Sequence, residues 1–392
     1  MRAERGSEMC KALLSKLRKQ AITLNKSNVE GSEMESKQIQ KAGENSQQYQ
    51  AGTIIINQGT TEERVKAIFS EMIPSALQAY TSDAYAIAKQ RIEMLENNVW
   101  LKLDTIDGFL QAFADPAFQI LLRKAQQTAA ATERDDDYAL LSELLVCHVQ
   151  KGSDRKNRAG INQAIEIVDQ IDNDALCALT VAHAVTNYLP VSGDCMEGLH
   201  VLDSLFSQLM YQELPVGTAW FDHLDVLGAI RISMLSMKSF SEYFASQLNG
   251  YACTGVKADS DDYKKAAEIL RNVQVSGSLL VPNECLDGYM RLKICNESSI
   301  DDLTSNDDSV RIPLSDNQID AIRQVWKLYE KDANLQKQAT TKFTKLCEGF
   351  DSLHKVQLWW DSIPNAFQIT CVGKILAHTN AKRCSPGIPD LI

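Results

Sequence analysis

Apolar residues recur at steps of three and four along most of the chain beyond residue 60, and this period constrains the fold more than any other feature. Val65, Ile68 and Met72 begin the pattern, and similar short runs separated by polar turns continue almost to the end of the sequence. A stripe with a period near 3.6 residues is typical of a helix that buries one face. The sequence therefore predicts a mostly α protein, either a multi-helix bundle or a HEAT-like helical array, although we find no strict repeat period.

Polar residues mark where the predicted helices begin. Thr60 and Glu63 form a capping box, and Pro74 is expected to kink or restart the helix that follows. The acidic triplet 135–137 is interpreted as a further helix start, because carboxylates there meet free backbone N–H groups and the positive end of the helix dipole. The other predicted helices cover residues 106–114, 117–131, 138–149, 161–171, 175–188, 199–209, 223–245, 263–273 and a run that begins at Ser315.

One segment, residues 49–59, differs from the helical pattern. It holds three adjacent isoleucines, Ile54, Ile55 and Ile56, between Gly52 and Gly59. Such β-branched residues favour one short N-terminal β-strand, which needs a neighbour to pair or pack with. Two alternatives stay open: the strand lies against the helical body of its own chain, or equivalent strands of several protomers pair.

The region after this strand is a candidate for self-association. Ile73, Leu77, Tyr80, Ala84 and Ile87 follow one another at alternating steps of four and three, the spacing of a packed helical seam. The pattern fades at Arg91, which favours a short helical pairing. The oligomer-interface candidates are Ile54, Ile55, Ile56, Leu77 and Tyr80.

Composition suggests how the chain divides. Residues 1–48 are rich in Ser, Lys, Glu, Gln and Asn and predict a disordered arm. The polar, acidic run 296–314 is the best candidate for a linker. Near the end, residues 367–370 alternate like a strand and residues 372–376 turn helical, and this last element is expected to pack back onto the body. The expected parts are 1–48 (arm), 49–104 (strand plus long amphipathic helix), 105–295 (helical body), 296–314 (acidic linker) and 315–392 (C-terminal helical unit).

Charge and cysteine content restrict the setting of the protein. A formal net charge of −11 disfavours non-specific attraction to nucleic acid or to an anionic membrane. The ten cysteines include no C-x-x-C pair, which predicts reduced thiols and a cytoplasmic location. We expect no signal peptide and no membrane span, because the longest uncharged stretch, 175–193, is interrupted by polar residues and Pro190.

Common catalytic motifs are missing from the sequence. It contains no P-loop, no G-x-S-x-G elbow and no H-E-x-x-H. We therefore assign no catalytic, metal-binding or cofactor-binding residue, predict no cofactor, and incline against an enzyme.

Two groups of polar residues are candidates for a catalytic site. Asp222, His223 and Asp225 place carboxylates beside an imidazole, but Asp222 is better explained as a helix cap and His223 as a packing residue. Cys147 and His148 are adjacent, and neighbours on a helix diverge by about 100°, so a buried cysteine is favoured there.

A basic turn is the one candidate for contact with phosphate or with an acidic partner. Lys151, Arg155, Lys156 and Arg158 gather between two predicted helices. An ordinary solvated loop remains the preferred explanation.

Three segments carry a resemblance to a known family. They are residues 50–60 (QAGTIIINQGT), residues 113–119 (FADPAFQ) with the helices of 140–185, and residues 367–380 (FQITCVGKILAHTN). The chain resembles an uncharacterised bacterial protein family whose members carry locus-tag names and have no established activity. The resemblance implies a bacterial cytoplasmic setting and, by analogy with similar strand-then-helix openings in conflict-system proteins, an anti-phage context.

These observations lead to one hypothesis and two alternatives. The hypothesis is a non-enzymatic helical interaction protein that forms a homo-oligomer or binds another protein, as a scaffold, sensor or regulator in bacterial anti-phage defence. The first alternative is a hydrolase or nuclease with an unrecognised site between helices, built from His223, Asp222 or Cys147. The second is a nucleic-acid sensor that uses the basic turn of residues 151–158.

Overall fold

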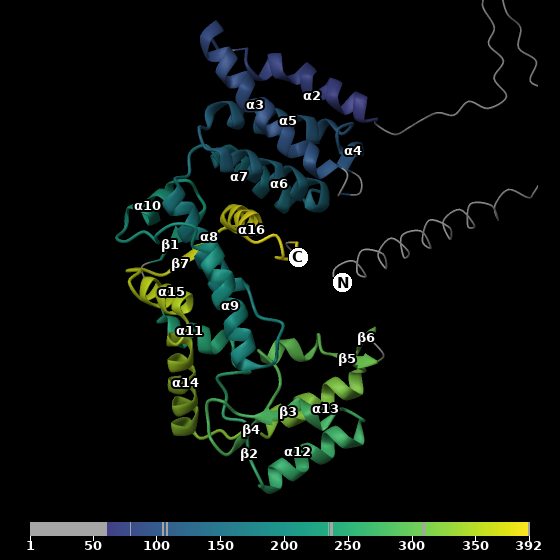
Figure 1. The fold of residues 1–392 in the computed structure, drawn as a ribbon, viewed down its shortest axis with the longest axis vertical. Helices are drawn as coiled ribbons and strands as arrows, with labels where there is room; N and C mark the ends of the chain where they lie inside the picture. The colour runs from purple at the N-terminus through teal and green to yellow at the C-terminus, as the bar shows by residue number, and fades with distance from the viewer. Residues whose placement is uncertain are drawn as a thin grey trace, which may run out of the picture. The chain divides into compact units, whose positions relative to one another are not determined.

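The structure is a computed structural model (Figure 1). It describes residues 61–390 except 79, 104–105, 107–108, 234, 236–237 and 308–309. The arm expected at 1–48 and the strand expected at 49–59 lie outside these residues. The described residues belong to one compact unit and are mainly helical, which confirms the prediction of a mostly α protein.

The first half of the described chain is entirely helical. Asp115, Asp154 and Asp172 cap three of its helices by accepting hydrogen bonds from backbone N–H groups. The acidic triplet opens α6, as predicted. The helices are α2 (Glu62–Ala76), α3 (Ser82–Leu103), α4 (Phe109–Ala112), α5 (Pro116–Ala131), α6 (Asp135–Lys151), α7 (Arg155–Ile167) and α8 (Asn173–Asn187).

The single long helix expected within residues 49–104 is in fact two helices. Helix α2 begins at Glu62, capped by Thr61, and ends at Ala76, two residues after Pro74. Proline has no N–H to donate and crowds the preceding turn, so a helix rarely continues far beyond it. The seam predicted from Ile73 to Ile87 therefore crosses a helix break.

The predicted helix 223–245 is also divided. Helix α10 (Ala219–Val226) ends where Gly228 adopts a left-handed conformation, with φ +70°. The Ala229 N–H then bonds the Leu224 carbonyl at 2.9 Å, as in a Schellman ending. Strand β1 (Ile230–Ile232) and helix α11 (Phe240–Gln247) follow, and α9 (Cys195–Leu209) precedes α10.

Strands also occur between residues 256 and 313, where the sequence predicted only helices and a linker. Strands β2 (Val256–Lys257), β4 (Tyr289–Leu292) and β3 (Leu280–Pro282) form an antiparallel sheet in that order, which packs with α12 (Asp261–Asn272) and α13 (Asp316–Lys327) around a second apolar cluster. The segment expected as a linker, 296–314, contains a 3-10 helix (Glu297–Ile300) and a hairpin of β5 (Thr304–Asp307) and β6 (Val310–Pro313). A short 3-10 helix, Gly277–Leu279, precedes β3.

A buried arginine fixes α9 against this sheet. The Arg291 side chain is completely buried and donates two hydrogen bonds to the Glu284 carboxylate, at 2.6 and 2.8 Å. It also donates to the carbonyl of Gly193, just before α9, at 3.1 Å. A buried guanidinium needs such a complete set of acceptors.

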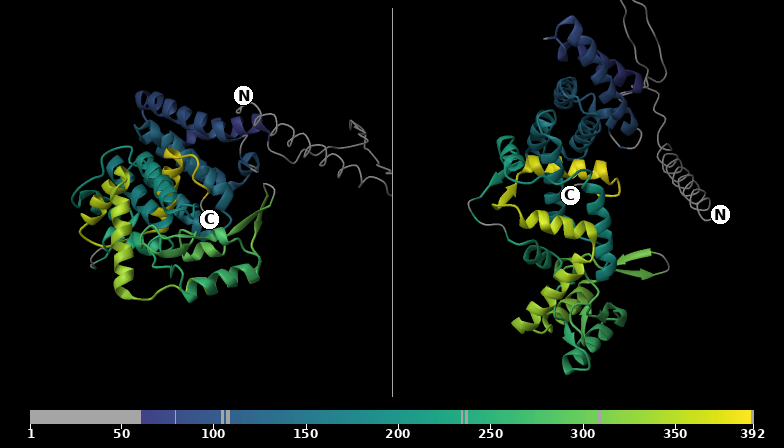
Figure 2. Two further views of the ribbon diagram at one scale, coloured as in Figure 1. Left: turned by 60° about the horizontal axis from the view of Figure 1, so that its bottom comes forward. Right: turned by 60° about the vertical axis from the view of Figure 1, so that its left-hand side comes forward.

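The C-terminal elements return to the helices of the first half. Helices α14 (Ala333–Glu348) and α15 (Asp351–Asp361) lead to β7 (Phe367–Ile369), which pairs antiparallel with β1, and then to α16 (Cys371–Cys384). Helix α16 packs against α6, α7 and α8, and both views of Figure 2 show it surrounded by helices from earlier in the chain. The prediction that this last element packs onto the body is confirmed.

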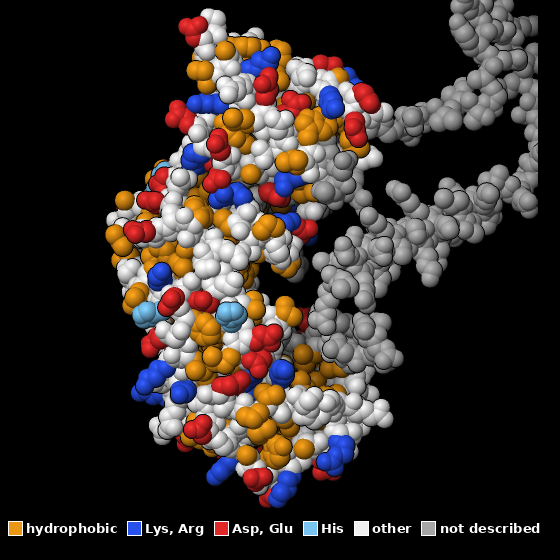
Figure 3. All heavy atoms as spheres, viewed as in Figure 1, with side chains coloured by type: hydrophobic (Ala, Val, Ile, Leu, Met, Phe, Trp, Pro, Cys, Tyr) orange, Lys and Arg blue, Asp and Glu red, His pale blue; other side chains and the backbone are white. Residues whose placement is uncertain are grey.

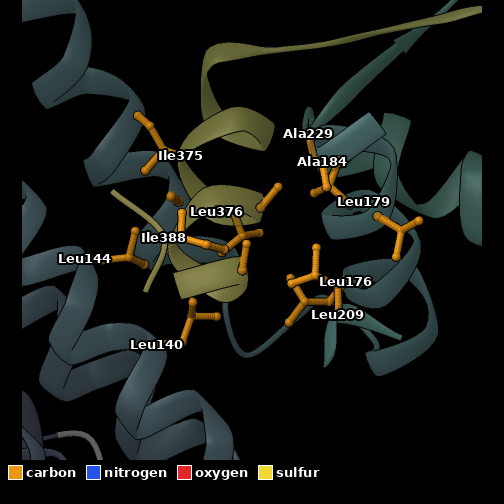
Figure 4. Packing of buried hydrophobic residues seen from close by; sticks show 14 of the residues in the cluster. Leu140, Leu144, Leu176, Leu179, Ala184, Leu209, Ala229, Ile375, Leu376 and Ile388 are labelled. Carbon is orange, nitrogen blue, oxygen red and sulfur yellow. The ribbon is translucent and has the colours of Figure 1, made fainter. Parts of the chain in front are cut away.

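Helix α16 is buried on all sides rather than along one stripe. Every residue from Ile375 to Ala381 is buried. Figure 4 shows Leu140 and Leu144 of α6 on one side of it and Leu176 and Leu179 of α8 on the other. Its buried Asn380 donates a hydrogen bond to Thr180 of α8 at 2.9 Å, so these two polar side chains are paired inside the contact. No helix of the described residues has both the length and the apolar character needed to cross a bilayer.

Two glycines allow α16 to come this close. A Cβ atom on Gly373 would lie 2.0 Å from the Ala229 carbonyl oxygen, and one on Gly160 of α7 would lie 2.7 Å from the Ile375 side chain. The first obstacle is backbone and cannot rotate away.

We predict that Gly373→Ala destabilises the fold by about 3 kcal/mol, because the added methyl forces α16 away from residues 228–229. Urea unfolding of the full chain measures the change. Gly277→Ala is the matched control, since a Cβ there meets nothing within 4 Å, and it should leave stability nearly unchanged. Equal stability of Gly373→Ala and the wild type would show that α16 is not held as closely as described.

Candidate functional site

A cavity of about 920 Å³ lies between α8, α9, α16 and the residues that follow α16. Its size suits a small organic molecule. Residues of the four helices α7, α8, α9 and α16, together with the segment 385–390, form most of its wall. The lining residues are Asn157, His183, Asn187, Tyr188, Leu189, His200, Val201, Ser204, Leu205, Gln208, Cys371, Lys374, Ile375, His378, Ser385, Gly387, Ile388, Pro389 and Asp390.

Helical spacing places the polar lining residues. His183 and Asn187 are four residues apart on α8, and Lys374 and His378 are four apart on α16, so each pair shares a face. Helices α8 and α16 pack directly on each other, which brings the two faces together.

Two histidines and a tyrosine meet in this wall. The His183 and His378 rings are perpendicular, with centroids 6.0 Å apart. The Tyr188 hydroxyl lies 2.9 Å from Nδ1 of His378, and its ring lies edge-on to His183 at 5.3 Å. Both histidines are at least nine-tenths buried.

Each imidazole has one ring nitrogen without a partner. Nδ1 of His183 lies 3.0 Å from the Asn187 amide nitrogen. The same amide nitrogen lies 2.9 Å from the His183 carbonyl oxygen and 2.7 Å from the Thr186 hydroxyl, so its two hydrogens face three acceptors. Nε2 of His183 and Nε2 of His378 are buried and have no hydrogen-bond partner within the described part of the chain. Buried polar atoms are usually paired, so these two atoms are exceptions. Each has almost no accessible surface, so neither is open to the cavity.

Burial keeps both rings uncharged near neutral pH. It lowers the pKa of His183 to about 3, with further contributions from His378 and Lys374. Burial also lowers the pKa of His378. A neutral imidazole offers hydrogen bonds without adding charge.

The charged residues of the wall are few. Lys374 is exposed at the rim and pairs with no carboxylate of the described residues. Asp390 is paired with Lys382 and accepts a hydrogen bond from Gln150 at 3.2 Å. Lys374 therefore supplies an uncompensated positive charge at the cavity.

The arrangement suits recognition better than covalent chemistry. The hydroxyl that reaches an imidazole is that of Tyr188, whose pKa is raised by burial. Within the described residues, neither Ser204 nor Cys371 makes a hydrogen bond to His183 or His378. An activated nucleophile needs such a contact with its base. No group of three or more His, Cys, Asp or Glu side chains among residues 61–390, apart from the undescribed positions, is placed to hold a metal ion.

The basic turn is divided between two helices. Lys151 is the last residue of α6, whereas Arg155, Lys156 and Arg158 lie in the first turn of α7. None of the four forms an ion pair with a described carboxylate. Asp154, which lies between Lys151 and Arg155 in the sequence, caps the N-terminus of α7. Figure 3 shows charged side chains of both signs interspersed over the described residues of one face.

The oligomer-interface candidates have different environments. Ile54, Ile55 and Ile56 lie outside the described residues. Leu77 is 1% exposed and packs in the core of its own chain, whereas Tyr80 is 39% exposed.

Tyr80 is followed by a row of exposed apolar residues on helix α3. Ile87, Met94 and Leu101 follow it at intervals of seven residues and are 55%, 36% and 78% exposed. An exposed apolar row with this period is typical of a helix that pairs with another helix.

The residues considered from the sequence for catalysis, Cys147, Asp222 and His223, do not lie together in one cavity. His223 lies in a second cavity with Asp172, Asp174 and Glu213, and its Nε2 is 3.7 Å from the Asp172 carboxylate. Cys147 and Asp222 do not line that cavity. Burial raises the pKa of the Cys147 thiol to about 11, so it is protonated and unreactive at neutral pH.

Sequence reasoning missed His183, His378 and Lys374. The available signal was the polar interruption of an uncharged helix at Thr180, His183 and Asn187. Nothing in the sequence connects this helix with His378, almost 200 residues later, so the pairing needed the fold.

Comparison with known proteins adds a family but no activity. A model of an uncharacterised protein family matches residues 59–391. No curated protein and no solved structure matches the chain.

We predict that acid destabilises the protein partly through His183. The folded-state pKa of about 3 lies below the ordinary 6.5, so between these values the unfolded chain binds a proton that the folded chain does not. The contribution is therefore complete above pH 6.5 and is lost as the pH falls toward 3. His183→Gln should reduce the loss of unfolding free energy between pH 7 and pH 5 by about 2 kcal/mol, measured by urea unfolding.

The control is His200→Gln, because His200 is exposed. This variant should keep the pH dependence of the wild type. If His183→Gln keeps it too, the buried imidazole is not neutral in the folded protein.

Proposed function

We propose a binding role without catalysis for this chain, which belongs to the uncharacterised family matched over residues 59–391. In this proposal the cavity between α8, α9 and α16 holds a small molecule, and the protein acts as a sensor or regulator that also contacts a protein partner.

The observation that carries the proposal is the cavity of about 920 Å³, whose wall includes the polar residues Asn187, Lys374 and His378. The cavity also has an apolar side, formed by residues such as Val201, Leu205 and Ile375. A largely apolar pocket with a few convergent polar groups is the usual form of a ligand site.

A specific feature supports a protein partner as well. The exposed row Ile87, Met94 and Leu101 on α3 suits pairing with the same row of a second copy. Self-association is thus proposed through α3, and pairing of the strand expected at 49–59 remains a separate prediction. The cytoplasmic location and the anti-phage context remain predictions from the sequence.

The two sequence-based alternatives have less support. A hydrolase or nuclease built from Cys147, Asp222 and His223 lacks a shared cavity. A nucleic-acid sensor based on residues 151–158 is opposed by the net charge of −11.

Ligand binding is tested by filling the cavity. Ser204 is exposed in its wall, so Ser204→Trp should occupy the space without disturbing the core. A chemically mixed set of small acids, amines and neutral compounds is tested against the full chain by ligand-observed NMR. We expect at least one compound to bind the wild type and to lose binding to Ser204→Trp.

Met196→Trp is the matched control on the same helix. Met196 is 46% exposed and does not line the cavity, so this variant should bind as the wild type does. Failure of all compounds to bind, or binding that survives Ser204→Trp, would contradict the proposed ligand site.

Self-association is tested by light scattering. The full chain should exceed its monomer mass of 43.6 kDa at micromolar concentration, and Ile87→Glu with Leu101→Glu should lower the mass by placing charge in the contact. Val226→Glu, at an exposed position on α10, is the control.

A version without residues 1–59 separates the two proposed contacts. It stays associated if α3 mediates the contact and becomes monomeric if the predicted strand does. A wild-type mass of 43.6 kDa at all concentrations would remove both.

A further inference from the structure

We infer that the second cavity, which lies between α8, α10 and residues 212–216, is a docking site for a segment of a partner protein that carries basic and apolar side chains. This site is separate from the cavity beside α16 and from the proposed contact through α3, so the inference does not depend on either of them.

The walls of the second cavity are fixed to the rest of the fold. The cavity has a volume of about 800 Å³, and α10 packs against α8 beside it (Figure 1). The segment that leads into α10 is held at two points. The Gln212 amide donates to the Asp174 carboxylate at 2.6 Å, and the Trp359 indole N–H donates to the Pro215 carbonyl at 3.0 Å. A site whose walls are already in place loses little conformational entropy on binding.

Three exposed carboxylates line this cavity, those of Asp172, Asp174 and Glu213. None of them forms an ion pair with a lysine or arginine of the described residues. Asp172 caps α8, and the N-terminus of that helix offsets about half a charge. Most of the negative charge of the wall therefore remains available to a partner.

The neighbouring basic groups do not remove this charge. Arg134 donates to Asn173 at 2.9 Å, but its guanidinium is paired with Asp137. His223 lies near one carboxylate, that of Asp172, at 3.7 Å. Even a protonated His223 would therefore leave the charges of the other two carboxylates uncompensated. The cavity attracts a cation and repels an anion.

Apolar surface adjoins the carboxylates and continues outside the cavity. Val216 lines the cavity and is 84% exposed. Ala219 and Val226 lie seven residues apart on one face of α10, and Val226 is also 84% exposed although it lies outside the cavity. Exposed apolar surface bordered by charges is typical of a protein-binding site. Because this surface extends beyond the cavity, it suits a peptide segment better than a small cation.

The two kinds of contact define the partner segment. Its lysine or arginine side chains lie among the carboxylates, and their methylene groups cover apolar surface. Exposed ion pairs alone contribute little to affinity, so an apolar side chain of the segment must also pack on Val216.

The test uses a fluorescent peptide of lysine, leucine and glycine in mixed order, titrated with the full chain at physiological salt and followed by fluorescence anisotropy. We expect saturable binding. A second peptide with serine in place of each leucine, and a third with glutamate in place of each lysine, should bind at least about fivefold more weakly, because each lacks one kind of contact.

Charge variants separate local attraction from the total charge of −11. Asp174→Asn with Glu213→Gln should weaken the first peptide about fivefold, because two exposed ion pairs are lost. The substitution at Asp174 keeps an oxygen acceptor for Gln212. Asp262→Asn with Glu268→Gln on α12 is the matched control. It removes the same charge from exposed positions and should bind as the wild type does.

A further variant tests the apolar contact. Val216→Ser should weaken the first peptide about threefold and leave binding of the serine peptide unchanged, because only leucine packs on the valine side chain. Val191→Ser, at a 93% exposed position beyond the other end of α8, should have no effect on either peptide.

Spermine, titrated in parallel, distinguishes a peptide from a small polycation. Binding of spermine at least about fivefold weaker than that of the first peptide supports the docking site. Spermine that binds as tightly as the peptide, and loses the same affinity in Asp174→Asn with Glu213→Gln, shows that the cavity takes a small cation instead. Absence of saturable binding by the first peptide, equal weakening by the two charge variants, or unchanged binding to Val216→Ser also overturns the docking site.

Discussion

The fold depends on the burial of α16 among helices from the first half of the chain. Residues 375–381 are buried on every side, between α6, α7 and α8. Gly160 and Gly373 permit the close approach, and the bond from Asn380 to Thr180 satisfies polar groups inside it. A helix whose middle is buried on every side depends on such packing for its stability. The other C-terminal elements serve to return the chain to this position.

The candidate site follows from the same contact. His378 and Lys374 belong to α16 and His183 belongs to α8, so the helix pair that completes the core also places two neutral imidazoles and one ammonium group at a single cavity. Burial lowers the pKa of His183, so its ring stays uncharged within this contact. Residues of the helix pair that completes the core therefore also form part of the cavity wall.

Sequence patterns predicted the helices well and the cavity hardly at all. The acidic triplet opens α6, and the alternation at residues 367–369 followed by a helix appears as β7 and α16. Strands β2, β3 and β4 were missed because they have two to four residues, too few to show a period of two. The break after α10 depends on the left-handed Gly228, which a helical pattern cannot reveal. His183 and His378 are brought together only by tertiary packing, and each alone is an ordinary buried histidine.

The late position of α16 in the chain has a consequence for biosynthesis. Tyr188 and His378, which are in contact, are 190 residues apart. During translation, α6, α7 and α8 emerge long before the helix that covers their apolar faces, so those faces stay open to water or to a chaperone until the ribosome has added residues 371–384. Folding that must wait for such distant contacts is slow and prone to misassociation. This cavity therefore forms only after residues 371–384 have been synthesised, and a chain that ends before them lacks it.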